Sequence, residues 1–282
     1  MPDWFDETDA EDLIIRFATE GIAARERTAF QDLVIFDTPR FGRALALDGI
    51  VQLTESDEFY YHEMIAHVPL LAHGRARRVL VIGGGDGGAI REVLRHEVDE
   101  VVMVELDPHV VEACREHLPS VNAGAFEDPR LELRFEDGVA YVAQCDRQFD
   151  VILVDSTDPV PGPGEVLFGE PFYRDCKRML APGGILVSQL GVPFLYPEAV
   201  RGARRRLARC FADVTFYIVA VPVFAGGYMA FGWASDDRGL RDLPAETLAS
   251  RLKASGIETR FYTPAFHRAS FVLPRPIAEL LD

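Results

Sequence analysis

The feature that most constrains the fold is a regular alternation of strand-like and helix-like segments that begins at residue 78. In chain order the segments read RVLVIG, AIREVLRH, EVVMVEL, HVVEACREHL, LELRF, GVAYVAQC, FDVILVD, EPFYRDCKRML, GILVSQL and PEAVRGARRRLARC. Strands near 213–220 and 228–234 and a helix near 244–254 follow. Strands that alternate with crossover helices are typical of a parallel sheet covered on both faces. We therefore predict an α/β fold with a Rossmann-like, doubly wound sheet.

The residues before this alternation follow a different pattern. Residues 30–53 contain LVIFDT, RALALDG and IVQLT, which are short strand-like runs separated by turns with glycine. A helix is expected from about residue 57 to residue 71, with an apolar face that begins at Tyr61. We assign residues 1–55 to a small N-terminal antiparallel β domain and residues 56–282 to the Rossmann-like catalytic domain.

The charge balance restricts the partners that the chain can bind. Lys and Arg total 29 whereas Asp and Glu total 45, so the net charge is −16 at pH 7. A field of this sign attracts cations and disfavours nucleic acid and anionic membranes. The N-terminal segment is acidic, unlike a signal peptide, and no apolar run is long enough to span a bilayer. We expect a cytoplasmic protein with no nucleic-acid or membrane partner.

A glycine-rich loop, VLVIGGGDGG, follows the first strand of the alternation. Gly83, Gly85 and Gly88 have the dinucleotide-binding spacing, but Asp86 lies where a pyrophosphate would sit. A carboxylate about 4 Å from a phosphate charge costs on the order of 4 kcal/mol at an effective dielectric near 20. The same carboxylate favours a cation, and the loop itself holds no basic residue. We therefore predict a ligand that carries a positive charge and no phosphate.

Two further carboxylates follow later strands. Glu105 ends the second strand of the alternation, where an acid accepts hydrogen bonds from ribose hydroxyls. Together with the glycine turn and Asp86, it indicates an adenosyl sulfonium compound. Asp137 follows the third strand, where a carboxylate either accepts from an adenine amino group or caps the following helix.

The loop after the fourth strand, VILVDSTDPVPGPGE, carries Asp155 at the end of the strand and Asp158 three residues later. Ligands of open α/β sheets bind at this edge, so the two acids are candidates for a cation site, although turn chemistry also favours aspartate there. Tyr61 belongs either to the apolar face of its helix or to a site, whereas His62 lies off that face. No histidine has zinc-type spacing to other ligands, so we predict no metal.

With these residues assembled, the sequence resembles the polyamine aminopropyltransferases. Matching segments cover nearly the whole chain, and the combination of GGGDGG with DSTDP is highly specific. The main matches are FQDLVIF at 30–36, LALDGIVQLTESDEFYYHEMIAHVPLLAH at 45–73, VLVIGGGDGG at 79–88, VELD at 104–107, EDG at 136–138, DSTDP at 155–159, GPGEVLF at 162–168 and HRASFVLP at 267–274. The resemblance implies a homodimer or homotetramer that uses no metal and no cofactor.

The resemblance also implies a reaction. Decarboxylated S-adenosylmethionine would be the co-substrate that donates an aminopropyl group, and a diamine, usually putrescine, would accept it. The products would be spermidine and 5'-methylthioadenosine. Cadaverine, diaminopropane, agmatine and spermidine remain alternative acceptors.

Residue roles carry over on the matching positions. The resemblance makes Asp155 the catalytic proton acceptor. Donor-binding residues would be Gln31, Asp86, Glu105, Asp137, Gly138 and Pro163. Residues at the amine site would be Tyr61, His62, Asp86, Asp155, Asp158 and Phe224.

The sequence departs from the family pattern at two places. The family's P-T-Y-x-G-G stretch reads PVFAGG at 222–227, so Phe224 lacks the tyrosine hydroxyl. The loop after Asp158 has one residue more, which leaves open which proline contacts the nucleoside. Both departures border the acceptor site.

Three other functions remain open on the residues alone. An NAD-dependent oxidoreductase would use the same glycine spacing, but Asp86 disfavours its cofactor. A methyltransferase would bind intact S-adenosylmethionine, whose carboxylate Asp86 should repel. A polyamine-binding protein without activity is disfavoured by the presence of both Asp155 and Asp158.

Overall fold

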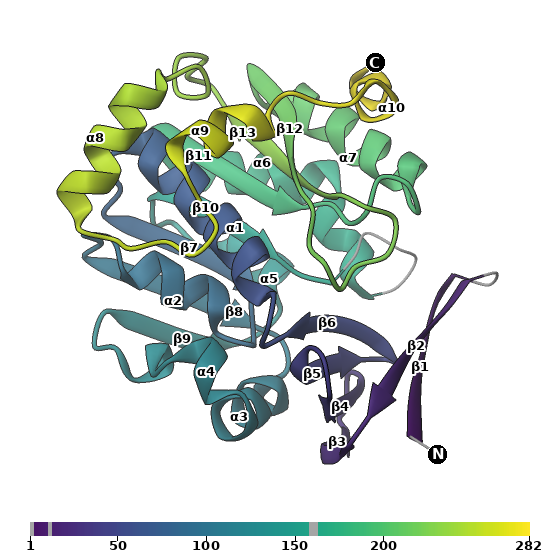
Figure 1. Cartoon of the computed structure of the whole chain (residues 1–282). Coiled ribbons are helices and arrows are strands. Elements are labelled where there is room, and N and C mark those ends of the chain that lie inside the picture. Colours follow the sequence, from purple (N-terminus) through teal and green to yellow (C-terminus); the bar gives the residue numbers. More distant parts are fainter. Residues whose placement is uncertain (1–2, 11–12, 158–162) are drawn as a thin grey trace.

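The central element of the structure is a seven-stranded sheet (Figure 1). The computed structural model describes residues 3–10, 13–157 and 163–282, and there the strand order is β12-β13-β11-β10-β7-β8-β9. The strands are β7 (Arg78–Gly83), β8 (Glu100–Glu105), β9 (Leu131–Phe135), β10 (Phe149–Asp155), β11 (Leu180–Gln189), β12 (Asp213–Val219) and β13 (Met229–Ser235). Strands β7 to β11 pair in parallel, whereas β13 is antiparallel to both of its neighbours. The predicted doubly wound, Rossmann-like sheet is confirmed.

Helices cover both faces of this sheet, because its central strands are apolar on both sides. Val79 and Val81 of β7 belong to one buried core, and Leu80 and Ile82 belong to a second core on the opposite face. Covering the first face are α1 (Glu58–His73), α2 (Gly88–Leu94), α8 (Ala245–Ser255) and α9 (Pro264–Ser270), and covering the second are α5 (Gly138–Gln144), α6 (Glu170–Met179) and α7 (Pro197–Cys210). Short pieces are α10 (Arg275–Ala278), η1 (Ala125–Glu127), η2 (Pro163–Phe168) and η3 (Glu279–Leu281). None of the described helices combines the length and apolarity that crossing a bilayer requires.

The N-terminal part contains more strands than the sequence pattern predicts. A hairpin of β1 (Asp3–Ala10) and β2 (Leu13–Thr19) projects from the body (Figure 1). A separate antiparallel sheet is formed by β3 (Gly21–Arg27), β4 (Asp32–Thr38), β5 (Gly42–Leu47) and β6 (Ile50–Thr54). Strands β4 to β6 match the prediction over 30–53. Strands β1 to β3 escape it because exposed and charged side chains interrupt their apolar alternation.

The N-terminal sheet is held against two helices of the Rossmann-like part, α3 (Pro108–His117) and α4 (Pro119–Asn122). Leu33 and Leu45 of the sheet share a small buried core with Val110 and Cys114 of α3. Because α3 follows β8, this packing brings the loop between β3 and β4 to the carboxyl edge of the central sheet.

A histidine is buried without charge under the C-terminal segment. His267 of α9 is fully buried, and its Nδ1 lies 2.9 Å from the hydroxyl of Tyr262. Its Nε2 has no hydrogen-bond partner within the described part of the chain. Burial, together with the nearby charge of Arg268, lowers the pKa of His267 to about 3.

This burial predicts a specific dependence of stability on pH. The unfolded chain takes up a proton on His267 below about pH 6.5, whereas the folded chain does not until about pH 3, so stability is lost as the pH falls between these values. In His267→Asn the side-chain carbonyl can accept the hydrogen bond from Tyr262 in place of Nδ1. As the pH is lowered, we expect the free energy of unfolding of this variant to fall less than that of the parent. The difference should reach about 2 kcal/mol between pH 7 and pH 5.

Urea unfolding at each pH measures this difference. The same two proteins compared between pH 8 and pH 7 provide the control, because His267 is neutral in both states there. Parallel stability curves from pH 7 to pH 5 would contradict the assignment.

Candidate active site

The candidate site lies at the carboxyl edge of the parallel strands, where open α/β sheets bind ligands. His62 from the first turns of α1, Asp86 from the loop between β7 and α2, and Asp155 at the end of β10 meet there. One ligand-type atom of each lies within 4.8 Å of the others. The structure therefore brings together three residues that the sequence separates widely.

The glycine loop is pressed against the end of β10. A Cβ atom at Gly83 would lie 2.2 Å from the carbonyl oxygen of Asp155, and the Gly84 N–H donates to that oxygen at 2.8 Å. Both glycines have positive φ angles, of 83° and 75°. On the other side of the loop, a Cβ at Gly85 would lie 3.0 Å from Oε2 of Glu105. Because these glycines have no side chains, the loop can lie against Asp155 on one side and Glu105 on the other.

Asp86 is paired with a base that α1 supplies. Its Oδ1 lies 3.2 Å from Nε2 of His62 and accepts a hydrogen bond from the Gly88 N–H at 2.7 Å. The Nδ1 atom of His62 lies 2.6 Å from Oε2 of Glu58, and Arg91 donates to both oxygens of Glu58. Burial alone would lower the pKa of His62, but the carboxylates of Asp86 and Glu58 raise it to about 10. His62 is therefore a cation at neutral pH.

This pairing corrects the sequence argument about Asp86. The loop contains no base, as predicted, but the charge of Asp86 is not unpaired because His62 arrives from another element. The ion pair lowers the pKa of Asp86 in spite of its burial, so Asp86 is ionised. It also weakens the argument that a donor carboxylate is excluded by repulsion, since a cation stands beside the acid.

Asp155 has a different environment. The hydroxyl of Tyr61 donates to its Oδ1 at 2.5 Å, while its buried Oδ2 has no hydrogen-bond partner among the residues that the structure describes. Burial and the charge of Asp86 raise the pKa of Asp155 to about 6, against the opposing effects of His62 and Tyr61. A carboxyl group with a pKa near the working pH is suited to accept a proton.

Tyr61 combines the two roles between which the sequence could not choose. Its ring centroid lies 5.0 Å from that of Phe231 in β13, so the ring packs on the apolar core. Its hydroxyl reaches Asp155.

Glu105 and Gln31 are linked through Asp107 at a second point of the same edge. Burial raises the pKa of Glu105 to about 7, although its Oε1 accepts from the Asp107 N–H at 3.0 Å. The carboxylate of Asp107 is fully buried and accepts hydrogen bonds from Gln31 Nε2 at 3.0 Å and from the Thr28 hydroxyl at 2.7 Å. Gln31 of the N-terminal part is therefore fastened next to the predicted ribose-binding acid.

Three predicted donor-site residues follow later strands. Asp137 is exposed, and its Oδ1 accepts from the N–H groups of Val139 and Ala140, so it caps α5. Gly138 allows close packing, because a Cβ there would lie 2.6 Å from a methyl carbon of Ile82. Pro163 begins η2. Its contact with a nucleoside stays a prediction, as does that of Asp137.

The acceptor side is described in part. Phe224 lies in the loop between β12 and β13, half-buried against the main core. The neighbouring Val223 N–H donates to Oδ2 of Asp57 at 2.7 Å, which ties this loop to the start of α1 and so to Tyr61. Asp158 lies outside the described residues.

The cluster of His62, Asp86 and Asp155 has the atom types of a metal site. However, an imidazolium has no lone pair to give to a metal, and both ring nitrogens of His62 face carboxylates. The donor set therefore fits an ion pair better than a metal, and the absence of a metal stays a prediction.

Sequence reasoning missed Glu58 and Arg91. Glu58 stands four residues before His62, and this i, i+4 spacing on a helix was the available signal. Arg91 has no comparable signal, because it reaches Glu58 from the next helix.

The close contact of α2 with His62 yields a prediction. A Cβ atom at Gly88 would lie 2.3 Å from Cε1 of the buried His62 ring, so Gly88→Ala must displace His62 or α2. We expect it to destabilise the protein by about 1–3 kcal/mol, measured by urea unfolding. As the matched control, Gly202→Ala within α7, where only the tip of Arg206 is near, should be neutral or stabilising. Equal unfolding midpoints for Gly88→Ala and the parent would refute the contact.

Known proteins share this fold and this sequence. Residues 3–55 match the family described as spermidine synthase tetramerisation domain, and residues 58–242 match the spermine/spermidine synthase domain. The chain is 52% identical over 267 residues to the polyamine aminopropyltransferase of Serratia proteamaculans, and 52% identical to polyamine aminopropyltransferase 1 of Pseudomonas aeruginosa. Each alignment covers 94% of this chain and 93% of the relative.

Solved structures agree with these matches. A spermidine synthase in complex with the transition state analogue AdoDATO superposes with a TM-score of 0.94 at 34% identity, covering 100% of this chain and 96% of the other. The spermidine synthase of Thermotoga maritima gives a TM-score of 0.90 at 32% identity, covering 100% and 95%. The chain therefore belongs to the spermine/spermidine synthase family.

Proposed function

We propose that this enzyme transfers the aminopropyl group of decarboxylated S-adenosylmethionine to a diamine, with putrescine as the first candidate. The products are spermidine and 5'-methylthioadenosine. The observation that carries the proposal is the position of Asp155. A carboxyl group with a raised pKa lies beside the glycine loop, in a chain whose relatives are polyamine aminopropyltransferases.

The donor lies along the carboxyl edge of β7 and β8. Glu105 accepts from the ribose hydroxyls, and Gln31, held on Asp107, closes the nucleoside side. Asp137, Gly138 and Pro163 border the adenine. Asp86 faces the positively charged aminopropyl part, with His62 fixing its carboxylate.

The chemical step is attack of a neutral amine on the carbon next to the sulfonium sulfur. An alkylamine titrates near pH 10.4, as lysine does, so its deprotonation at pH 7 costs about 4.6 kcal/mol. Asp155 takes this proton. Because the pKa of Asp155 is about 6 rather than 3.8, moving the proton to it costs about 3 kcal/mol less than moving the proton to an ordinary aspartate, at 1.36 kcal/mol for each pH unit.

Tyr61 holds the carboxyl group of Asp155 in place during this transfer. The other end of the diamine stays charged and is anchored by acid, for which Asp158 is the candidate. Phe224 presents a ring without a hydroxyl to this side, so the acceptor can differ from putrescine. Cadaverine, diaminopropane, agmatine and spermidine are the alternatives. Mass spectrometry of the products, with all five amines in competition, identifies the acceptor.

The assembly and setting of the enzyme complete the proposal. The match of residues 3–55 to a tetramerisation domain supports oligomers formed through this part, as a homodimer or a homotetramer. The enzyme acts in the cytoplasm on small-molecule substrates, without a metal or other cofactor. Light scattering coupled to gel filtration measures the oligomeric state.

The assignment of Asp155 as the base predicts the effect of its removal. Asp155→Asn should leave donor affinity within a few fold but lower kcat by at least roughly 10²-fold. In the parent, kcat/KM should fall as the pH drops below about 6, because a protonated Asp155 cannot accept the amine proton. Steady-state kinetics at each pH measures both effects. Asp146→Asn, at a fully exposed acid, serves as the control, and near-normal turnover of Asp155→Asn rules out its role as base.

The charge of Asp86 predicts a difference between two ligands. Asp86→Asn should weaken binding of the decarboxylated donor, which carries an ammonium group, more than binding of 5'-methylthioadenosine, which does not. The reason is that the variant leaves the His62 cation uncompensated on the donor side. Isothermal titration calorimetry with both ligands gives the comparison, and equal losses would show that Asp86 does not read the ammonium.

A further inference from the structure

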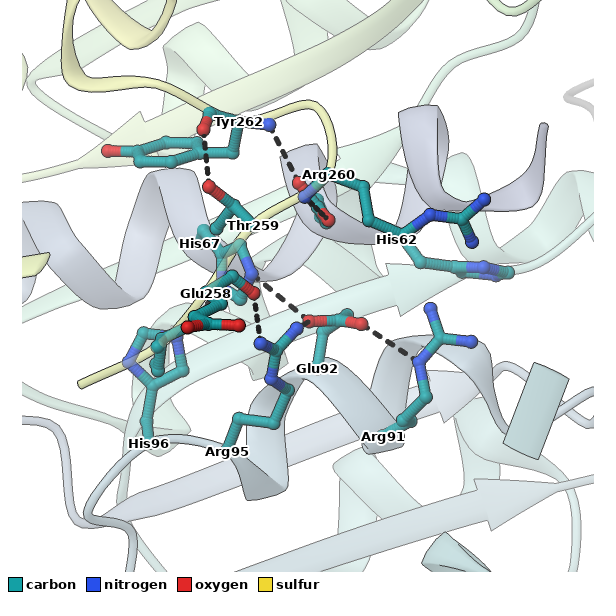
Figure 2. Close-up of polar contacts among 12 residues, drawn as sticks. His62, His67, Arg91, Glu92, Arg95, His96, Glu258, Thr259, Arg260 and Tyr262 are labelled. Carbon is teal, nitrogen blue, oxygen red and sulfur yellow. Dashed lines mark hydrogen bonds and ion pairs between the residues drawn. The ribbon is translucent and has the colours of Figure 1, made fainter. Parts of the chain in front are cut away.

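A buried carboxylate stands behind the His62–Asp86 pair. Glu58 is 4% exposed, its Oε2 lies 2.6 Å from Nδ1 of His62, and Arg91 donates to its two oxygens at 3.1 and 2.8 Å. Arg91 also contacts Glu92 at 2.8 Å, and Figure 2 shows this contact continuing to Arg95. A chain of alternating charges thus runs from the site, between α1 and α2, to the exposed Arg95.

The ring of His62 has little freedom in this chain. It is 2% exposed, and the missing side chain of Gly88 leaves only the space that the ring occupies. One ring nitrogen faces Glu58 and the other faces Asp86. A neutral imidazole carries one N–H and would direct a lone pair at one of the two carboxylates, whereas an imidazolium donates to both.

We propose that Glu58 is a positioning residue for the aminopropyl transfer: by accepting from Nδ1 of His62 it keeps the second ring N–H directed at Asp86, and so sets the orientation and charge of Asp86 toward the substrate ammonium. This inference rests on the proposed function for its substrate. The contacts within the protein stand independently of it.

The charges around His62 show why Glu58 is needed. Asp86 and Asp155 face His62 from the loop after β7 and from the end of β10, Glu58 faces it from α1, and Arg91 lies behind Glu58 on α2. The pKa of Asp155 is raised and its Oδ1 is hydrogen-bonded to Tyr61, so its negative charge stabilises the His62 cation less than that of Asp86 does. Without Glu58, only Asp86 would hold the proton on His62 against burial. His62 would then lose its proton at a lower pH, and Asp86 would be held by a neutral N–H instead of by an ion pair.

The test follows the protonation of His62 directly. The full-length protein, labelled with ¹³C and ¹⁵N in histidine, is titrated by NMR, and His62→Gln identifies the signal. In the parent we expect both ring nitrogens to stay protonated up to pH 9. In Glu58→Gln we expect His62 to lose its proton at least about 2.5 pH units lower than in the parent, which is the shift that a tenfold change by pH 8.5 requires.

Kinetics links this titration to the substrate. The donor KM of Glu58→Gln should lie within about threefold of the parent at pH 6.5 and rise at least tenfold by pH 8.5, while the parent changes less than threefold. A merely structural role predicts a loss that does not depend on pH. The matched control is Glu92→Gln, which also removes a buried carboxylate from Arg91 but does not contact His62. It should lower the unfolding midpoint without any new dependence of KM on pH.

Distinct outcomes overturn the inference. It fails if His62 of the parent loses its proton below pH 8, a result that needs no variant to fold. It also fails if Glu58→Gln leaves the His62 titration unchanged, or if Glu92→Gln reproduces the change in KM. If the protein shows no aminopropyl transfer but His62 titrates as expected, the proposed function is refuted, whereas the role of Glu58 in keeping His62 protonated beside Asp86 stands.

Discussion

The site depends on the contact between the glycine loop and the end of β10. In the parallel pairing of β7 and β10, Gly83 is the partner of Asp155, so both strands end at the same level. No side chain larger than hydrogen fits at Gly83, and the Gly84 N–H holds the Asp155 carbonyl. Two acids, Asp86 and Asp155, are thereby brought to one edge from distant parts of the chain. The repulsion between these two acids, which raises the pKa of Asp155, follows from that placement.

Two acids placed so close cannot have the same environment. Asp86 receives the His62 cation, which lowers its pKa. Burial and the repulsion of Asp86 raise the pKa of Asp155, and the neutral hydroxyl of Tyr61 offsets them only in part. Pairs of titratable groups whose pKa values are driven apart in this way are typical of acid–base chemistry. Since Tyr61 and His62 are neighbours on α1, one helix distributes the two environments. The adjacent Asp57 anchors the loop that carries Phe224.

Much of the fold was predictable because the sequence signals were local. Apolar runs separated by helical segments indicated the parallel strands, and the glycine spacing located the loop between β7 and α2. Strands β1 to β3 were not predictable, because they bury few side chains and lack a clear apolar alternation. The sequence allows two interpretations of Asp137, and its hydrogen bonds to Val139 and Ala140 match the helix cap.

The candidate site was also predictable only in part. Asp86, Glu105 and Asp155 were recognisable from the sequence, because each lies at the end of a strand, or in the loop after one, whose position the pattern revealed. Their charge states were not, since Arg91, Glu58 and His62 act on Asp86 through space from two helices. The sequence by itself determined the order of the elements and the chemistry of the side chains at the carboxyl edge. Only the tertiary structure decided which acid is paired and which is available for a proton, because pKa values depend on distance and burial, and neither is set until the helices pack.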